Sequence, residues 1–432
     1  MLFCFWIGVQ LNCLKEGNMP EKEPLVFKNA RIITPMRVID NGVLIVSDGK
    51  VSNVGSEDKI KIPENAKVID AAGKYLAPGF IDIHLHGGGG ADTMDATEEA
   101  MEKISVAHAK GGATSIVPTT TSAPMDDIIK AVKVIELAKK RTLPGAQVLG
   151  AHIEGPYFSM EQRGAQNPEF LKEPKPEEYL KLLDEYDCIL RVSAAPELEG
   201  ALELGRELRR REIVASIAHT NATYQGILAA VEAGYTHVTH MYSGMSGLTR
   251  INAYRISGVI ESTLLLDELT TEVIADGHHL PPSLMKLIIK VKSLDKVSVI
   301  TDAISAAGLG PGKYSIGGLD AIVEDDVAEE FEVPRREGNY VARLLTRDAF
   351  AGSVTTMNLC VRNMIKLVGL SIQDAIKMAT LNPAKVIGVD EKKGSLVEGK
   401  DADLVVFDKK INILTAVVKG KVVFSRLSSC LS

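Results

Sequence analysis

The sequence has few cysteines, little charge imbalance and no long apolar segment. Its five cysteines are scattered through 432 residues without a CxxC spacing, which excludes a disulfide framework and a thiolate zinc site and favours reduced thiols. The 49 basic and 56 acidic residues leave a net charge of −7, so no attraction to nucleic acid or to an anionic membrane is expected. With 45% hydrophobic and 24% charged residues, the chain is predicted to be a mildly acidic cytoplasmic enzyme with a large core.

Residues 1–18 include an apolar run that differs from a secretory signal. The run lacks a basic start, a sustained apolar core and a small-residue cleavage site, and it is too short to span a bilayer. Met19 directly precedes the first β-rich segment, so we interpret residues 1–18 as an upstream start-codon artefact or a disordered leader. A weak membrane anchor is the less favoured interpretation.

Two β-rich flanks enclose a long middle region. The flanks, 19–76 and 381–432, contain short Val-rich runs separated by turn residues, which predicts one small β-sandwich built from both chain ends. In the middle region, 77–380, amphipathic stretches alternate with eight β-branched runs: 79–87, 113–122, 146–156, 188–197, 211–220, 237–245, 271–279 and 296–305. Eight strand–helix units predict an α/β fold with a (β/α)8 TIM-like barrel, although periodicity alone does not exclude an open doubly wound sheet.

Ionisable residues recur at the ends of these runs, where a buried charge is costly unless it has a partner. They are His84, His86, His152, Glu154, His219, His240, Asp276, His278, His279 and Asp302. His84 and His86 are two apart on a predicted strand, so both imidazoles face the barrel axis and can bind one cation. Singly, each residue has a structural alternative: a core histidine, a backbone-bound carboxylate or, for Asp302, a helix cap. Together they indicate a His/carboxylate site for zinc or another first-row divalent ion.

Three other features have plainer interpretations. His108 lies in a helical stretch and His237 begins the sixth run, so both are expected to be surface or packing residues. The Gly87–Gly90 run is not followed by a phosphate-loop Lys-Ser/Thr, so it is interpreted as flexible backbone beside the metal site. Residues 323–353 interrupt the last unit and are expected to form a loop or hairpin, either near the site or as a surface excursion.

Six segments in order carry a family resemblance: PGFIDIHLHG, HIEGP, IAHT, THMYSGM, IADGHH and TDAISAAG. From about residue 25 to about residue 425, the chain resembles the amidohydrolase superfamily and, within it, the N-acetylglucosamine-6-phosphate deacetylase family. The resemblance implies a barrel with a small β-sandwich, usually in a homodimer. It also implies one or two divalent ions per subunit, with Zn²⁺ favoured and Fe²⁺, Co²⁺ or Mn²⁺ as alternatives.

The resemblance also implies a role for each strand-end residue. Asp302 is the implied catalytic carboxylate and His279 an implied substrate contact. The fourth run ends in Ser193-Ala-Ala-Pro196, without the carboxylated lysine that bridges the metals in other branches, which agrees with Glu154 as the bridge. The implied metal ligands are His84, His86, Glu154, His219, His240 and Asp302.

Two positions depart from the family pattern. Gln166 stands where the family usually has a histidine that reaches the substrate, and an amide can donate a hydrogen bond but cannot become cationic. Ser243 and Gly244 replace Asn-Ala, and their backbone N–H groups can still hold a phosphate. Arg250 or Arg255 is expected to supply a cationic phosphate contact, from this chain or across a dimer, with an exposed solvated arginine as the equal alternative.

The implied reaction is hydrolysis of the N-acetyl amide of N-acetylglucosamine 6-phosphate to glucosamine 6-phosphate and acetate. Water activated at the metal attacks the acetyl carbonyl, and Asp302 accepts the water proton before donating it to the departing amine. The alternatives are an N-acetylgalactosamine 6-phosphate or N-acyl amino acid substrate, deamination or lactam hydrolysis, and a catalytically inactive scaffold. The expected partner is a small amino-sugar phosphate, with no nucleic acid and no membrane.

Overall fold

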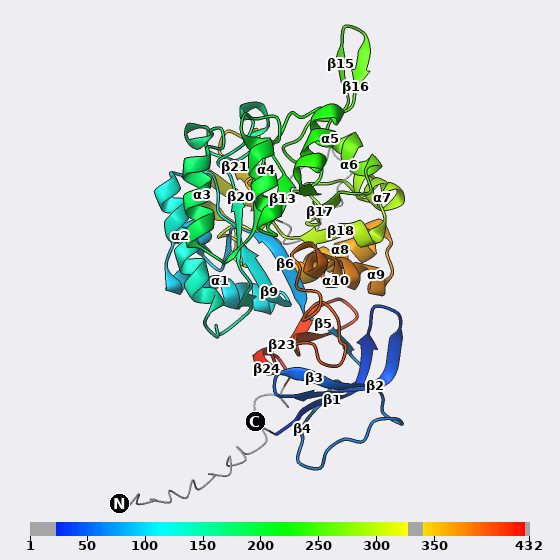
Figure 1. Cartoon of the computed structure of the whole chain (residues 1–432). Helices are drawn as coiled ribbons and strands as arrows, with labels where there is room; N and C mark the ends of the chain where they lie inside the picture. The colour runs from blue at the N-terminus through cyan, green and yellow to red at the C-terminus, as the bar shows by residue number, and fades with distance from the viewer. Residues whose placement is uncertain (1–22, 327–339, 428–432) are drawn as a thin grey trace, which may run out of the picture.

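The chain folds into a large α/β body and a smaller β-sheet (Figure 1). The computed structural model describes residues 23–326 and 340–427, so the expected leader at 1–18 lies outside the described residues. None of the described helices combines the length and the apolar character that crossing a bilayer would require.

The smaller sheet contains strands from both flanks of the chain. Its strand order is β24-β23-β22-β5-β1-β2-β3, with β4 paired to β1. The antiparallel pair of β5 and β22, in which Leu76 lies opposite Val406, joins the two flanks. The strands are β1 (Leu25–Ile33), β2 (Val38–Ser47), β3 (Lys50–Ser56), β4 (Lys67–Asp70), β5 (Tyr75–Pro78), β22 (Leu404–Phe407), β23 (Ile413–Val418) and β24 (Lys421–Ser425).

Eight parallel strands overlap the eight predicted runs, although the sixth strand begins two residues before its run and shares only residues 237 and 238 with it. They are β6 (Phe80–Leu85), β9 (Ala113–Pro118), β11 (Ala151–Glu154), β12 (Ile189–Ala194), β13 (Val214–Ile217), β14 (Tyr235–Val238), β17 (Thr270–Ile274) and β18 (Val297–Ile300). They form two sheets, β10-β9-β6 with β10 (Gln147–Val148) at its edge, and β11-β12-β13-β14-β17-β18. Isolated parallel bridges, Thr119 to His152 and Leu85 to Ala303, connect the two sheets at both edges. This cyclic order supports a TIM-like barrel.

Helices cover the outside of these strands, and their sequences explain their positions. In α4, Leu204 and Leu208 are buried four residues apart, while Arg209 and Arg210 occupy the last turn, where cations favour the helix dipole. The helices are α1 (Glu98–Lys110), α2 (Met125–Lys139), α3 (Pro176–Glu185), α4 (Ala201–Arg210), α5 (Tyr224–Ala233), α6 (Val259–Leu265), α7 (Pro282–Val291), α8 (Met357–Asn363), α9 (Ile372–Met378) and α10 (Leu381–Val386).

Two excursions leave the barrel. Strands β19 (Gly312–Ile316), β20 (Leu319–Asp325) and β21 (Tyr340–Leu344) form an antiparallel sheet. The described parts of the expected 323–353 insertion are the end of β20, then β21 and the segment that follows it. Strands β15 (Thr249–Ile251) and β16 (Tyr254–Ile256) form a hairpin that projects from the body (Figure 1).

The Gly87–Gly90 segment is held by hydrogen bonds, which corrects the expectation of flexible backbone. Strand β7 (Gly87–Gly88) pairs with β8 (Ala91–Asp92), and Gly87 N donates to Ala303 O at 2.9 Å. A Cβ at Gly87 would lie 2.3 Å from Ala91 O and 2.8 Å from Ser305 N, so glycine is needed there for close backbone approach.

Candidate metal centre and active site

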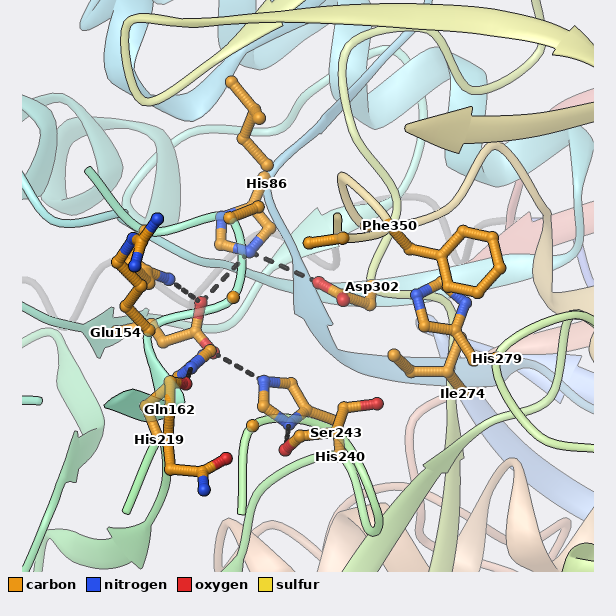
Figure 2. A pocket seen from close by; sticks show the side chains of 18 of the residues that line it. His86, Glu154, Gln162, His219, His240, Ser243, Ile274, His279, Asp302 and Phe350 are labelled. Atoms are coloured by element: carbon orange, nitrogen blue, oxygen red, sulfur yellow. Dashed lines mark hydrogen bonds and ion pairs between the residues drawn. The ribbon is translucent and has the colours of Figure 1, made fainter. Parts of the chain in front are cut away.

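A cavity of about 400 Å³ opens at the carboxyl ends of the barrel strands (Figure 2). The insertion contributes Asp348, Phe350 and Gly352 to its lining, which places the insertion beside the site. The cavity brings together nine predicted site residues: His86, Glu154, Gln166, His219, His240, Ser243, Gly244, His279 and Asp302.

Arg250 and Arg255 do not line this cavity. Both are exposed on the β15–β16 hairpin, where they lie opposite each other, and the Arg255 guanidinium donates to Ala253 O within the same hairpin. Within the described residues, neither guanidinium therefore reaches the cavity of its own chain. Arg163, which the sequence analysis did not select, is the only arginine or lysine among the described residues that line it.

Glu154 lies at the centre of two groups of candidate metal ligands. One group is Glu154 with His219 and His240, whose Nε2 atoms lie 3.7 and 3.1 Å from Glu154 Oε1. The same oxygen lies 3.4 Å from His84 Nε2, and Oε2 lies 3.2 Å from His86 Nε2. Glu154 can therefore bridge two cations.

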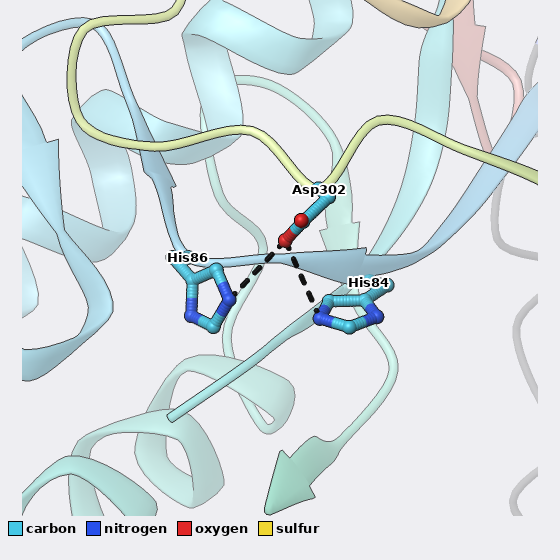
Figure 3. A group of neighbouring side chains, drawn as sticks. All are labelled: His84, His86 and Asp302. Carbon is cyan, nitrogen blue, oxygen red and sulfur yellow. Dashed lines mark ion pairs between the residues drawn. The ribbon is translucent and has the colours of Figure 1, made fainter. Parts of the chain in front are cut away.

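The second group consists of His84, His86 and Asp302 (Figure 3). Asp302 Oδ1 lies 3.5 Å from His84 Nε2 and 3.3 Å from His86 Nε2, so both imidazoles face the same carboxylate oxygen. The alternation of side chains along β6 brings the two histidines to one side, as the spacing predicts. All three residues are buried.

Fixed acceptors orient three of the four imidazoles. His219 Nδ1 lies 2.8 Å from Gln162 O and His240 Nδ1 lies 3.1 Å from Ser243 O, so each Nδ1–H donates to a carbonyl. His84 Nδ1–H donates to a carboxylate at 2.7 Å. With Nδ1 committed to a hydrogen bond, Nε2 is the atom that each ring presents to the centre.

Three candidate ligands have left-handed backbone conformations. The φ values are 44° at His219, 25° at His240 and 49° at Asp302, and each residue comes two positions after the last residue of its strand. Such a conformation costs about 1–3 kcal/mol for a residue other than glycine, and it persists where the surrounding structure enforces it. The equivalent turns point these three side chains into the cavity.

Gly244 is required beside His219. A Cβ at Gly244 would lie 2.6 Å from His219 Nδ1 and 2.9 Å from Gln162 O, so it would intrude on the hydrogen bond between them. The backbone φ of Gly244 is also positive, at 55°. The limited space beside His219 therefore explains why this chain has glycine at position 244, where it departs from the family pattern.

The electrostatics of the candidate ligands favour additional positive charge among them. Burial lowers the pKa of His84, but the carboxylates of Glu154 and Asp302 outweigh burial and raise that pKa to about 9. Burial acts likewise on His86, but the neighbouring carboxylates of Asp302 and Glu154 outweigh burial and raise the pKa of His86 well above its usual value. Burial favours the neutral form of Glu154, yet the charge of His84 keeps the Glu154 pKa well below its ordinary value. Protons on the imidazoles are one source of that charge, and a divalent cation is the other.

The residues fit a first-row divalent metal. His84 Nε2 and Asp302 Oδ1 are buried without a hydrogen-bond partner, which is costly unless something else meets them. In each group the ligand atoms lie within 4.8 Å of one another. Neutral imidazole nitrogens with carboxylate oxygens are ligands that zinc, iron, cobalt and manganese accept.

Gln166 contacts a metal-ligand candidate. Its Oε1 accepts hydrogen bonds from Thr121 Oγ1 at 3.0 Å and Ser122 N at 2.8 Å, which fixes the orientation of the amide. The amide nitrogen then donates to Glu154 Oε2 at 3.0 Å. One amide N–H is thus committed to Glu154, and the second remains for the cavity.

His279 is held on the wall of the cavity away from Glu154, next to Phe350 (Figure 2). Its Nδ1 lies 2.7 Å from Asp276 Oδ2, and its ring centroid lies 4.7 Å from that of Phe350. Burial lowers the pKa of His279, but the charge of Asp276 and the hydrogen bond to it outweigh burial and raise the pKa. Asp276 therefore favours a cationic His279.

Two charged residues that the sequence analysis passed over lie directly beneath the site. Arg191 on β12 and Glu272 on β17 form a fully buried ion pair, with Nη1 2.6 Å from Oε2. The sequence does mark both residues, because each is a charged residue inside an otherwise apolar run. Of the histidines expected at the surface or in packing, His237 is buried against Glu272, and His108 is buried with Nε2 2.9 Å from Gly87 O.

Comparisons with known proteins agree with this geometry. The chain is 35% identical over 406 residues to the N-acetylglucosamine-6-phosphate deacetylase of Bacillus subtilis, covering 93% of this chain and 98% of the relative. It is 34% identical over 397 residues to the N-acetylgalactosamine-6-phosphate deacetylase of Escherichia coli, covering 92% and 98%. The crystal structure of the N-acetylglucosamine-6-phosphate deacetylase of Pasteurella multocida superposes with a TM-score of 0.83 at 31% identity, covering 92% and 99%.

The family comparison covers most of the chain. Residues 75–423 match the amidohydrolase family, a range that starts in the smaller sheet, includes all eight barrel strands and ends in β24. The described candidate ligands all lie inside this range. The chain therefore belongs to the amidohydrolase family.

Proposed function

We propose that the protein hydrolyses the N-acetyl group of N-acetylglucosamine 6-phosphate and releases glucosamine 6-phosphate and acetate. The observation that carries the proposal is a buried pair of adjacent ligand groups at the barrel mouth, of which one contains Glu154 and the other contacts it through His84 and His86. Relatives that carry the deacetylase name match more than nine-tenths of the chain, which supports the same substrate class.

The proposed ligands are His84, His86, Glu154, His219, His240 and Asp302, for one or two ions. A divalent metal bound there supplies a Lewis acid for the acetyl carbonyl and lowers the pKa of water. Zn²⁺ is the proposed ion because His and carboxylate ligands suit it, with Fe²⁺, Co²⁺ and Mn²⁺ as the alternatives.

Asp302 is the proposed proton carrier. Burial favours its neutral form, but the charges of His84 and of the neighbouring His86 outweigh burial and lower the pKa of Asp302, so it starts as a base. It takes the proton of the attacking water and returns it to the amine, which cannot leave as an anion. His279 and the free N–H of Gln166 are the proposed donors to the sugar and to the acetyl oxygen.

Phosphate recognition has two proposed sources of positive charge. Arg163 lines the cavity in this chain, as do Ser243 and Gly244. Arg250 and Arg255 can contribute only from the hairpin of a second copy, in a homodimer. A guanidinium binds phosphate with charge-assisted hydrogen bonds in either arrangement.

N-acetylgalactosamine 6-phosphate is the second candidate substrate. The departures at Gln166, Ser243 and Gly244 alter the walls that face the sugar, and one relative at 34% identity is named for this substrate. Both candidates share the acetamide, the phosphate and the chemistry, and they differ in the configuration of one hydroxyl group.

Acetate release from four sugars tests the proposal. The metal-loaded enzyme is assayed with N-acetylglucosamine and N-acetylgalactosamine, each with and without the 6-phosphate. We expect the highest kcat/KM for N-acetylglucosamine 6-phosphate and a large loss without the phosphate. Preference for the galactose configuration would select the second candidate, and no acetate from any of the four would refute both.

We also propose the domain limits that the sequence suggests. Residues 77–380 form the (β/α)8 catalytic barrel, and the described parts of 19–76 and 381–432 form the β-sandwich, except that α10 (Leu381–Val386) packs against the barrel strands β6 and β18. The pairing of β5 with β22 supports the union of the two flanks. Cytoplasmic location is proposed as well, and the free thiols of Cys188 and Cys360 are compatible with it.

A further inference from the structure

We propose that Glu272, held in place by Arg191, is the positioning residue that orients His84 and His240 for metal binding. The inference rests on the proposed metal centre, and it assigns a role to two residues that contact neither the substrate nor the metal. Glu272 lies on β17 and Arg191 on β12, and both side chains are fully buried.

Both carboxylate oxygens of Glu272 accept hydrogen bonds. Oε1 accepts from His84 Nδ1 at 2.7 Å, from Arg191 Nη2 at 2.8 Å and from His240 N at 3.3 Å. Oε2 accepts from Arg191 Nη1 at 2.6 Å and from His237 Nε2 at 3.2 Å. The carboxylate therefore has little freedom to rotate, and it connects one ligand of each metal group.

Glu272 determines which nitrogen of His84 faces the centre. Because Nδ1–H donates to a carboxylate, Nε2 is directed toward Glu154 Oε1 and Asp302 Oδ1, at 3.4 and 3.5 Å. A carboxylate behind a metal-binding imidazole fixes the ring and raises its basicity, and its loss typically weakens metal binding 10–100-fold.

Glu272 also stabilises the backbone at His240. The amide N–H of His240 points at Oε1, at a residue whose φ of 25° is unfavourable without support. This contact acts on the main chain, whereas the contact with His84 acts on the ring. Loss of the carboxylate should therefore affect the His84 group more strongly than the Glu154–His219–His240 group.

Stability alone does not account for this ion pair. Replacing a buried pair by apolar residues of similar size is often neutral or stabilising, whereas removing one partner leaves a costly buried charge. The contacts of Glu272 converge instead on two residues of the proposed metal centre. Arg191 supplies the compensating charge that keeps Glu272 ionised beneath them.

The test separates orientation from folding. In the double variant Arg191→Met/Glu272→Leu, the charge pair is removed together, so the chain is expected to fold. The conservative variant Glu272→Gln keeps an acceptor for His84. The control His237→Gln disturbs Oε2 but leaves both metal-ligand contacts of Oε1. For each protein, zinc content after dialysis, zinc affinity by chelator competition and the melting temperature without zinc are measured.

We expect the double variant to lose about 10–100-fold in zinc affinity at one position, with a melting temperature close to that of the wild type. Glu272→Gln should fall between the double variant and the wild type, and His237→Gln should bind zinc normally. A folded double variant with wild-type affinity and stoichiometry would overturn the inference. If the double variant does not fold, an unchanged zinc affinity in Glu272→Gln would overturn it. A wild-type chain that binds no divalent metal would instead overturn the proposed function.

Discussion

Substitution of Gly244 by alanine tests whether the orientation of His219 depends on the space beside it. The added methyl group would lie 2.6 Å from His219 Nδ1 and 2.9 Å from Gln162 O, well inside van der Waals contact. The carbonyl belongs to the backbone, so the imidazole is the part that must move. Its movement breaks the Nδ1–H···O bond that directs Nε2 toward Glu154.

The expected cost has two parts. Alanine at a φ of 55° costs about 1 kcal/mol in backbone strain, because the left-handed region disfavours a Cβ. Loss of the hydrogen bond adds about 1 kcal/mol. A misdirected ligand should also lower zinc affinity by about 10–100-fold, since partners that orient a metal-binding imidazole have effects of this size.

Gly388 provides a matched control. It has a φ of 67°, and a Cβ there would meet nothing within 4 Å. Gly388→Ala should therefore show the backbone cost alone and keep the zinc affinity of the wild type. Melting temperature and chelator competition are measured for both variants, together with acetate release. Equal melting temperatures and equal, unchanged zinc affinities in the two variants would refute the steric reasoning.

Three further substitutions address the reaction and its substrate. Asp302→Asn should lower kcat by about 10²–10⁴-fold, because the proton carrier is lost, while zinc analysis shows metal retained at the Glu154–His219–His240 group, which does not contain Asp302; near-native turnover would reject the assignment. Asp276→Asn removes the charge that raises the pKa of His279, so the basic limb of the pH profile of kcat/KM should move to lower pH, and an unmoved limb would show that His279 does not titrate in catalysis. Arg163→Ala should raise KM about tenfold for the phosphorylated sugar and leave the unphosphorylated sugar unaffected, whereas no change would favour Arg250 or Arg255 from a second copy.

The positions of the barrel strands and of the candidate metal ligands could be predicted from sequence for one physical reason. A strand buried on both faces is continuously apolar, so a histidine or carboxylate at its end needs a partner. Equivalent ends meet at one face of a barrel, which brings His86, Glu154 and Asp302 together without knowledge of any contact. The same reasoning selected the other three proposed ligands within a larger set of strand-end residues, and the family resemblance narrowed that set to six, which are close in the structure.

The pairing of the two charged residues beneath the site could not be predicted from sequence in the same way. Arg191 and Glu272 each interrupt an apolar run, so the need for a partner was visible, but their pairing depends on contact between β12 and β17. These strands are separated by β13 and β14 in the sheet, and the two residues are 81 positions apart in sequence. This contact forms because the barrel closes and the two side chains are long enough to meet inside it. A local sequence pattern shows neither of these properties.

The hairpin and the glycine run illustrate a second limit. Arg250 and Arg255 were selected for their charge, yet they lie on a hairpin that projects from the body, with Asn252 and Ala253 in positive φ at its tight turn. At Gly87, composition suggested flexibility, whereas the residue is needed for a close contact with Ala91 O. Composition identifies the residue type, but only the packed structure shows the neighbour that requires it.

Metal dependence of turnover tests the central claim most directly. The chain is stripped with a chelator, and Zn²⁺ is added back while acetate release from N-acetylglucosamine 6-phosphate and bound zinc are measured together. We predict that activity is lost on stripping and returns in proportion to bound zinc, and that Glu154→Gln recovers neither. Full turnover in the stripped protein, or wild-type zinc binding and activity in Glu154→Gln, would contradict the account.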